Sequence, residues 1–214
     1  MPAIVPIVEG VGEVEAVPLL LRRLLQEEFA RYDWQVTKPK NAHGCGNLLT
    51  PGGIEKFLQY AQLESTCAAV LVLMDGDSVE ALPPAQRPEE DCAPGFAQLL
   101  ARRAAAIQPQ VPVVIVVATW EYEAWFLASI ETMEITGLSS YHAEMADTRS
   151  PKGWIDRHLP PGQKYLETID QAKMTHKLDF RRVEERSRSF RRLKNALSQL
   201  LEAYGENKSM VTPH

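Results

Sequence analysis

A short run of apolar residues, from Ala68 to Met74, constrains the fold more than any other stretch of the chain. The run is continuous, it contains two β-branched valines, and it has the length of a strand, which together predict a strand buried on both faces. Strands of this kind belong to parallel sheets that carry helices on both sides. The run therefore predicts an α/β fold.

Other segments extend this prediction to a mainly parallel sheet of about four strands. Ile4–Val8 and residues 111–118 are also apolar runs, and Trp34–Thr37 is a weaker candidate strand. Apolar residues recur at helical spacing in three segments, 17–29, 54–63 and 96–107. The alternation of strand and helix predicts right-handed crossovers with helices on both faces of the sheet.

Beyond residue 130 the pattern changes to helices and loops. We expect residues 1–130 to form the α/β core, 131–205 a helical extension packed on it, and 206–214 a flexible tail. Residues 78–94 are rich in proline and acidic residues, which predicts either a flap over the strand ends or a plain loop.

Acidic residues follow three of the four expected strands. In chain order they are Glu9 and Glu13, Asp75 and Asp77, and Glu121 and Glu123. Because the carboxyl ends of parallel strands lie at one edge of the sheet, we expect these carboxylates to converge in a crevice. Their mutual repulsion must then be offset by bound cations or by raised pKa values.

Two divalent cations would offset this repulsion. Mg²⁺ and Mn²⁺ prefer carboxylate oxygens and keep water ligands that a substrate can displace. Two such ions about 3.5–4 Å apart can clamp the attacking and leaving oxygens of a phosphodiester. The alternative for Asp75-Gly76-Asp77 is a solvated turn. The spacing of Glu121 and Glu123 suggests that one faces the crevice and the other faces solvent.

Other kinds of site are not indicated. The turn from Glu9 to Glu13 lacks the third glycine of a dinucleotide-binding loop, and the chain has no P-loop. The cysteines and histidines show neither Cys-x-x-Cys nor His-x-x-x-His spacing, so we expect no zinc site. No apolar stretch is long enough to span a membrane and no signal peptide is evident, which predicts a cytoplasmic protein without membrane contact.

The charge is unevenly distributed along the chain. The net charge is −5, but residues 177–194 hold eight basic and three acidic residues, a local charge of +5. Within this segment Arg188, Arg191 and Arg192 are candidate nucleic-acid contacts, and the alternative is a solvated helix face. Lys152 opens a predicted helix, from which it could reach the crevice and neutralise charge on a phosphate.

The motifs together resemble a known family. Val8-Glu9-Gly10-x-x-Glu13 followed by Asp75-Gly76-Asp77 resembles the Toprim domain of topoisomerases, primases and OLD-type nucleases. The Glu-Gly-x-x-Glu form is similar to the OLD-like branch, in which a glutamate replaces the lysine of many other Toprim proteins. Residues 119–125, 150–152 and 187–193 further resemble a group of small single-chain Toprim proteins of bacteria and archaea. The resemblance extends from Ile4 to about Leu201.

This resemblance implies a Toprim (Rossmann-like) fold and a role for each acidic residue. The catalytic residues would be Glu9 and Lys152, and the metal ligands would be Glu9, Glu13, Asp75, Asp77 and one or both of Glu121 and Glu123. The cofactor would be Mg²⁺ or Mn²⁺, with two ions bound.

The resemblance also implies a function and partners. The chain would be a divalent-metal-dependent nuclease that hydrolyses DNA or RNA, with DNA the favoured alternative, in a defence system against phage or plasmids. An ABC- or AAA-type ATPase encoded nearby would be its partner, and a homodimer is compatible with the sequence. We do not expect topoisomerase or primase activity, because no helicase, zinc-ribbon or winged-helix segment is evident. Two alternatives stay open: a non-catalytic subunit that binds nucleic acid or the ATPase, and a small-molecule phosphotransferase or phosphatase.

Overall fold

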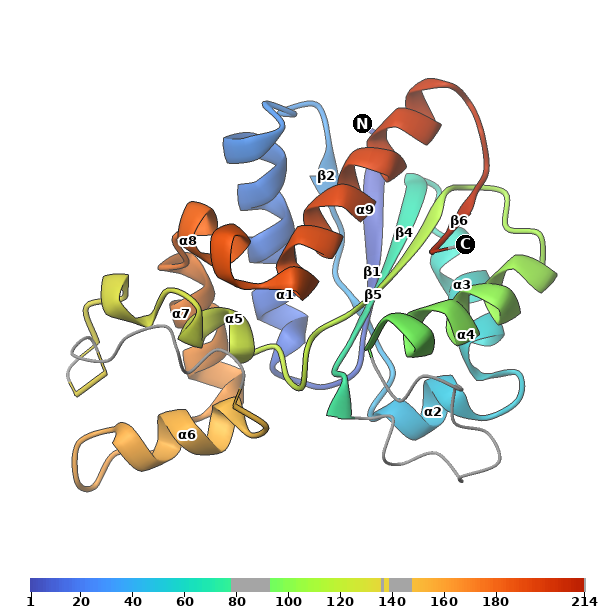
Figure 1. The fold of residues 1–214 in the computed structure, drawn as a ribbon. Helices are drawn as coiled ribbons and strands as arrows, with labels where there is room; N and C mark the ends of the chain where they lie inside the picture. The colour runs from blue at the N-terminus through green and yellow to red at the C-terminus, as the bar shows by residue number, and fades with distance from the viewer. Residues whose placement is uncertain (78–92, 136, 139–147, 214) are drawn as a thin grey trace.

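Three apolar strands form the centre of the sheet (Figure 1). They are β1 (Ala3–Val8), β4 (Cys67–Met74) and β5 (Val113–Val117), and β4 lies between the other two. The structure is a computed structural model that describes residues 1–77, 93–135, 137–138 and 148–213. All strand pairs among these residues are parallel, which confirms the predicted α/β class.

Three two-residue strands complete the sheet. They are β2 (Gln35–Val36) and β3 (Lys40–Asn41), which both pair with β1, and β6 (Val211–Thr212), which pairs with β5. The strand order is β2-β1-β4-β5-β6. The described residues thus form six strands where the sequence predicts about four, because a two-residue strand is too short to show a periodic pattern.

The carboxyl-terminal end differs from the expected flexible tail. Val211 lies opposite Val113, so part of 206–214 is a strand of the sheet. Its backbone pairs with the edge of β5, an interaction that side-chain pattern does not reveal. In the expected loop 78–94, Ala93 and Pro94 already belong to helix α4 (Ala93–Ala106). The rest of that segment, and with it the choice between flap and loop, lies outside the described residues.

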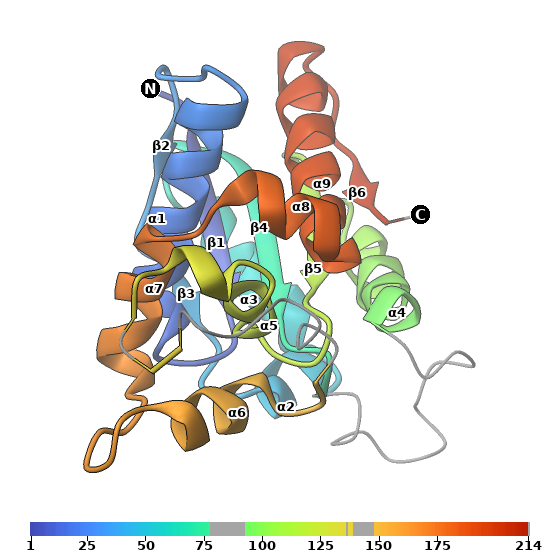
Figure 2. The ribbon, with the colours of Figure 1, turned by 60° about the vertical axis from the view of Figure 1, so that its left-hand side comes forward.

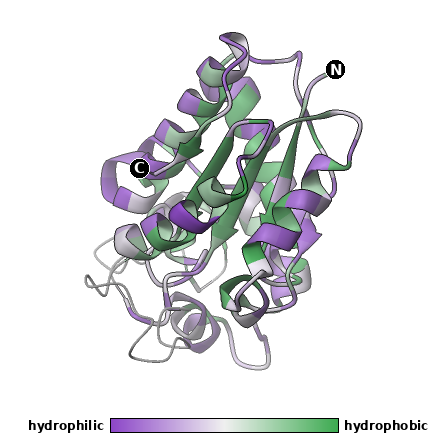
Figure 3. Cartoon of the chain, turned by 90° about the vertical axis from the view of Figure 1, so that its right-hand side faces the viewer, coloured by the Kyte–Doolittle hydropathy of each residue, from purple (hydrophilic) through white to green (hydrophobic). Residues whose placement is uncertain are grey.

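Helices cover both faces of the sheet, and the strands supply apolar side chains to each face alternately. Leu71 and Leu73 of β4 pack in one cluster, whereas Val70 and Val72 pack in the other. One face carries α1 (Glu13–Arg23), η1 (Leu24–Glu28), α5 (Ala124–Leu127), η4 (Ile130–Thr132), α7 (Ala172–His176), α8 (Phe180–Arg186) and α9 (Arg188–Gly205). The other carries α2 (Cys45–Leu49), α3 (Gly53–Gln62) and α4. Figure 3 shows the apolar strands inside and hydrophilic residues on the outer helices.

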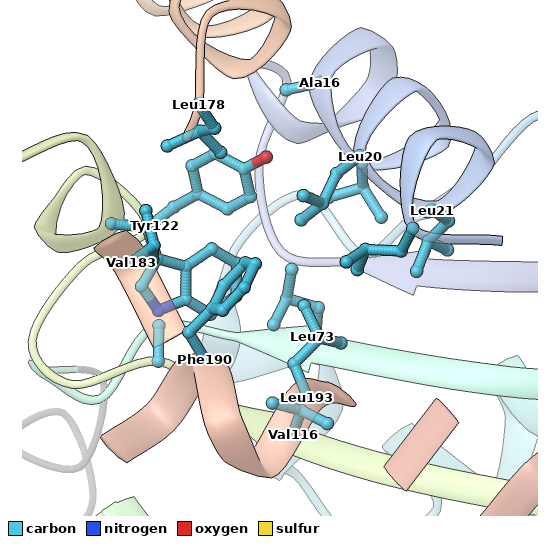
Figure 4. Packing of buried hydrophobic residues seen from close by; sticks show 14 of the residues in the cluster. Ala16, Leu20, Leu21, Leu73, Val116, Tyr122, Leu178, Val183, Phe190 and Leu193 are labelled. Atoms are coloured by element: carbon cyan, nitrogen blue, oxygen red, sulfur yellow. The ribbon is translucent and has the colours of Figure 1, made fainter. Parts of the chain in front are cut away.

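The carboxyl-terminal helices share the core of the sheet. Phe190 and Leu193 of α9 belong to the same apolar cluster as Leu20 of α1 and Leu73 of β4 (Figure 4). All four side chains are at most 2% exposed. Removing α9 would therefore expose one face of the sheet. No helix among the described residues is both long and apolar enough to cross a bilayer.

The path of the chain creates a crevice at the carboxyl ends of β1 and β4. After β1 the chain enters α1 on one face and goes on to β2, whereas after β4 it reaches α4 on the opposite face. Adjacent strands whose connections leave toward opposite faces mark the point where α/β sheets bind ligands. Helix α6 (Pro151–His158) lies at this end of the molecule in both ribbon views (Figures 1 and 2).

The shared core gives a test of how firmly α9 is integrated. Leu193→Ala should lower the free energy of unfolding by about 2–5 kcal/mol, because the side chain is fully buried and leaves a cavity. The matched control is Leu63→Ala, whose side chain is 79% exposed, and its effect should stay within about 0.5 kcal/mol. Urea unfolding measures both. Equal effects would mean that α9 does not pack as described.

Candidate active site

A pocket of about 260 Å³ opens at the carboxyl ends of the central strands. Seven carboxylates of the described residues line it: Glu9, Glu13, Asp75, Asp77, Glu121, Glu123 and Glu167. Lys152 and Gln171 also belong to the wall. The structure thus brings together all six acidic residues that the sequence singles out, together with the predicted lysine. Carboxylates far outnumber cations here, so the pocket is suited to positive ligands.

Glycine allows the ends of β4 and β5 to meet. A Cβ atom on Gly76 would lie 2.5 Å from the carbonyl oxygen of Ala118, so no other residue fits without a backbone shift. The N–H of Asp77 donates to the Trp120 carbonyl at 3.0 Å and holds the same contact. The Asp75–Asp77 turn is therefore fixed against the end of β5.

The acidic residues after β1 are held in two ways. The N–H of Asp75 donates to Oε2 of Glu9 at 3.3 Å, which links the ends of β1 and β4. The N–H of Gly10 donates to Oε2 of Glu13 at 3.0 Å. Glu13 is the first residue of α1, where the helix dipole favours a negative charge, and it is 9% exposed. Both carboxylates are thus positioned by backbone donors.

Asp75 lies at the centre of this group. Its Oδ1 accepts the N–H of Tyr122 at 2.9 Å, and the residue is half-buried. Burial raises the pKa of Asp75 well above its ordinary value, and the neighbouring negative charges of Glu13, Glu123 and Glu9 raise it further. Asp75 is therefore a weaker acid than an isolated aspartate.

Glu121 and Glu123 both line the pocket, Glu121 half-buried and Glu123 almost fully buried. They lie in a turn before α5, where the spacing rule for helices does not apply. Oε2 of Glu121 accepts the N–H of Lys152 at 2.7 Å. Glu123 is 2% exposed, and its Oε1 accepts hydrogen bonds from the Tyr165 hydroxyl at 2.8 Å and from Nε2 of Gln171 at 3.2 Å.

The carboxyl-terminal half of the chain adds two residues to the pocket wall that the sequence did not indicate, Glu167 and Gln171. Glu167 forms an ion pair with the ammonium group of Lys152. Glu167 and Gln171 come from η6 (Glu167–Gln171), a wide helical turn that contacts α1. Their sequence signal is weak: they are four residues apart and so lie close together on a helix, but nothing in the sequence places that helix near the strand ends.

The other predicted contacts lie elsewhere. Arg188, Arg191 and Arg192 do not line the pocket. Arg188 is exposed, and Arg191 donates to the carbonyls of Glu184 and Glu185, where it holds the connection between α8 and α9. Tyr122, Trp125 and Phe126 are fully buried in the core, as expected of most aromatic residues. A nucleic-acid role for the three arginines stays a prediction.

Residues 8–198 match the model of the family described as Domain of unknown function (DUF4276). The chain belongs to the DUF4276 family. Comparison with curated proteins and with solved structures gave no match. The function of this DUF4276 protein must therefore be inferred from the chemistry of its pocket.

The pocket has the oxygen donors of a cation site, but they are not arranged in a coordination geometry. Carboxylate oxygens dominate it, and the buried Oε1 of Gln171 has no hydrogen-bond partner. Hard divalent cations prefer such oxygen donors. Among the described residues, however, no three acidic, histidine or cysteine side chains are placed as a ready cation cage. Small side-chain movements would be needed to bring the oxygens around an ion.

Burial makes the stability of the metal-free DUF4276 protein depend on pH. Burial raises the pKa of Glu123 from 4.5 to about 7. The folded state thus binds this proton more strongly than the unfolded state, so protonation of Glu123 stabilises the fold. This stabilisation is complete below about pH 4.5 and is lost as the pH rises through about 7. The loss is on the order of 3 kcal/mol.

Urea unfolding in EDTA between pH 5 and pH 8 measures this effect. The wild type should lose stability across the range, and Glu123→Gln, which cannot ionise, should lose less by about the stated amount. Parallel pH profiles for the two proteins would contradict the assigned environment of Glu123.

Proposed function

We propose that this DUF4276 protein is a divalent-metal-dependent nuclease that hydrolyses phosphodiester bonds. One observation carries the proposal: carboxylates from the ends of three adjacent strands converge around Asp75, at the point where α/β sheets bind ligands. Such a cluster is unfavourable by itself, because each negative charge opposes ionisation of the others. A cation-dependent reaction gives the cluster a purpose.

The donor set fits Mg²⁺ or Mn²⁺. Asp75, Asp77 and Glu9 would hold one ion, and Glu13 with Glu121 or Glu123 would hold a second. When bound, such ions lower the pKa of water and neutralise charge on a phosphate. This assignment agrees with the Toprim resemblance, which gives the same residues the same roles.

The residues of the chain supply the proton transfers. In this proposal Glu9 takes the proton that a water molecule loses as its oxygen forms the new bond to phosphorus. The bridging P–O bond then breaks, and the ammonium group of Lys152 protonates the leaving oxygen. Lys152 is exposed at the mouth and pairs with Glu167, so a phosphate competes with Glu167 for it.

Two side chains near pocket residues in the chain, Trp120 and Arg149, would suit a polynucleotide better than a small phosphate ester. Trp120 is half-buried three residues after β5, and its carbonyl accepts the N–H of the pocket residue Asp77. The guanidinium of the exposed Arg149 lies 5.3 Å from the centre of the Trp120 ring. An arginine beside an aromatic ring suits a nucleic acid, since one contacts phosphate and the other stacks on a base.

The partner and the cellular setting rest on the Toprim resemblance alone. By that resemblance the protein would act with an ABC- or AAA-type ATPase in defence against phage or plasmids, with DNA favoured over RNA as the substrate and the choice between them left open. Reconstitution with the ATPase encoded next to its gene tests this part separately. Cleavage that depends on the ATPase would support it.

The nuclease proposal predicts a metal-dependent activity. With Mg²⁺ or Mn²⁺ the protein should cleave DNA or RNA, and Asp75→Asn or Glu9→Gln should reduce the rate by about 10²–10³-fold or more. Asp75→Asn should not lower the melting temperature in EDTA, because it removes charge repulsion. Asp33→Asn, at an exposed ion pair, is the matched control and should keep full activity.

The absence of cleavage by the wild type, with and without the ATPase, would overturn the proposal in favour of a binding subunit. Cleavage of small phosphate esters alone would instead indicate a phosphatase.

The pair of Trp120 and Arg149 predicts a specific contribution to nucleic-acid binding. Arg149→Ala should weaken the binding of a single-stranded oligonucleotide, measured with Ca²⁺ in place of Mg²⁺, by about 5–10-fold. The slope of the logarithm of the binding constant against the logarithm of the salt concentration should become shallower by about one. Arg31 stands in a similar way over Trp34, 5.7 Å from its ring centre, but Trp34 precedes Gln35, which pairs with Ala3 at the amino-terminal end of β1, away from the pocket. Arg31→Ala is therefore the matched control, and an equal effect of both variants would mean that binding is non-specific.

A further inference from the structure

We propose that Gln171 is a positioning residue of the cation site that acts through Glu123, and that position 12 is glycine because Gln171 occupies the adjacent space. This inference deepens the proposed function and rests on it. It assigns a role in the site to η6, a segment far along the chain from the acidic strand ends.

Gln171 is a buried amide in a wall made largely of carboxylates. The residue is 1% exposed. Its Nε2 donates to Oε1 of Glu123 at 3.2 Å, while its own Oε1 is buried without a hydrogen-bond partner. A buried polar atom of this kind costs stability. The protein tolerates this cost at a position where the amide holds a carboxylate that faces the pocket.

Gly12 supplies independent support. Gly12 is the N-cap of α1, and its backbone has φ −65° and ψ −43°, a right-handed conformation that an alanine can also adopt. The dihedral angles thus do not require glycine here. A Cβ atom at this position would lie 2.4 Å from Oε1 and 3.1 Å from Cδ of Gln171. A side chain at position 12 would therefore have to displace the amide of Gln171.

A glutamine fits this position better than the alternatives. Glu123 receives two donors at the same oxygen, one from Tyr165 and one from Gln171, which fix the orientation of its carboxylate. An amide donates without changing the charge of the pocket, whereas a glutamate would add repulsion and a lysine would replace the cation. Partners that orient metal ligands typically change metal affinity by 10–100-fold when they are removed.

The first measurement is the affinity of the protein for Mn²⁺ in the absence of any substrate. Electron paramagnetic resonance detects the free ion and so reports how much is bound. Gln171→Met keeps the size of the side chain but removes the donor, so it should bind Mn²⁺ about 10–100-fold more weakly than the wild type. Ser189→Ala is the control: it removes the buried partner of the Trp125 indole N–H and does not touch the pocket. It should lower the melting temperature and leave the Mn²⁺ affinity unchanged.

The second measurement is a double-mutant cycle between positions 12 and 171. Gly12→Ala should lower both the melting temperature and the Mn²⁺ affinity, because its Cβ atom displaces the amide. In a Gln171→Ala background the same change should leave the Mn²⁺ affinity unaltered and the melting temperature nearly unchanged, because the new methyl group no longer meets the amide. Glu167 Cβ, 3.1 Å from the new methyl group, needs to shift by only a few tenths of an ångström.

The outcomes separate this inference from the proposed function. If the wild type binds Mn²⁺ and the variants behave as expected but no nucleic acid is cleaved, the role of Gln171 stands and the nuclease proposal fails. If Gln171→Met binds Mn²⁺ as the wild type does, or Gly12→Ala has the same effect in both backgrounds, the inference is overturned even where cleavage is observed. A wild type that binds no Mn²⁺ also overturns it.

Discussion

Repulsion among the carboxylates at the strand ends is the constraint on which the rest of the structure depends. Asp75 is surrounded by the negative charges of Glu9, Glu13 and Glu123. The fold opposes this repulsion with rigid backbone: parallel strands fix the positions of the acidic turns, and Gly76 locks one turn against the neighbouring strand. The proposed cations would offset this repulsion, because they bring positive charge between the carboxylates.

The carboxyl-terminal half of the chain completes the site instead of only covering the sheet. Its helices share the apolar core with β1 and β4, and η6 contacts α1 directly at the acidic turn. From this segment come Lys152, the one lysine of the pocket wall among the described residues, and the amide of Gln171. The site is thus built from both halves, and neither half alone contains the residues that a phosphodiesterase reaction would need.

The sequence predicts the centre of the site well and its edges poorly. Asp75 follows a buried apolar run, and the rule for parallel sheets then places Glu9 beside it, so strand pattern and topology suffice. The position of Gln171 depends on how η6 packs against α1, which no local pattern encodes. The helical spacing rule does not apply to Glu121 and Glu123, because they lie in a turn before α5. The strand β6 is too short to show a periodic pattern in the sequence. Local periodicity therefore predicts elements, whereas packing between distant segments decides the rest.

The central claim is that the acidic pocket binds divalent cations. Crystals grown with Mn²⁺ and measured at the manganese absorption edge test it most directly, because the anomalous signal locates the ion itself. The account predicts at least one strong peak inside the pocket, about 2.2 Å from a carboxylate oxygen of Asp75, with further carboxylates drawn toward it. A pocket without such a peak at millimolar Mn²⁺, in a crystal that binds the ion elsewhere or not at all, would contradict the account.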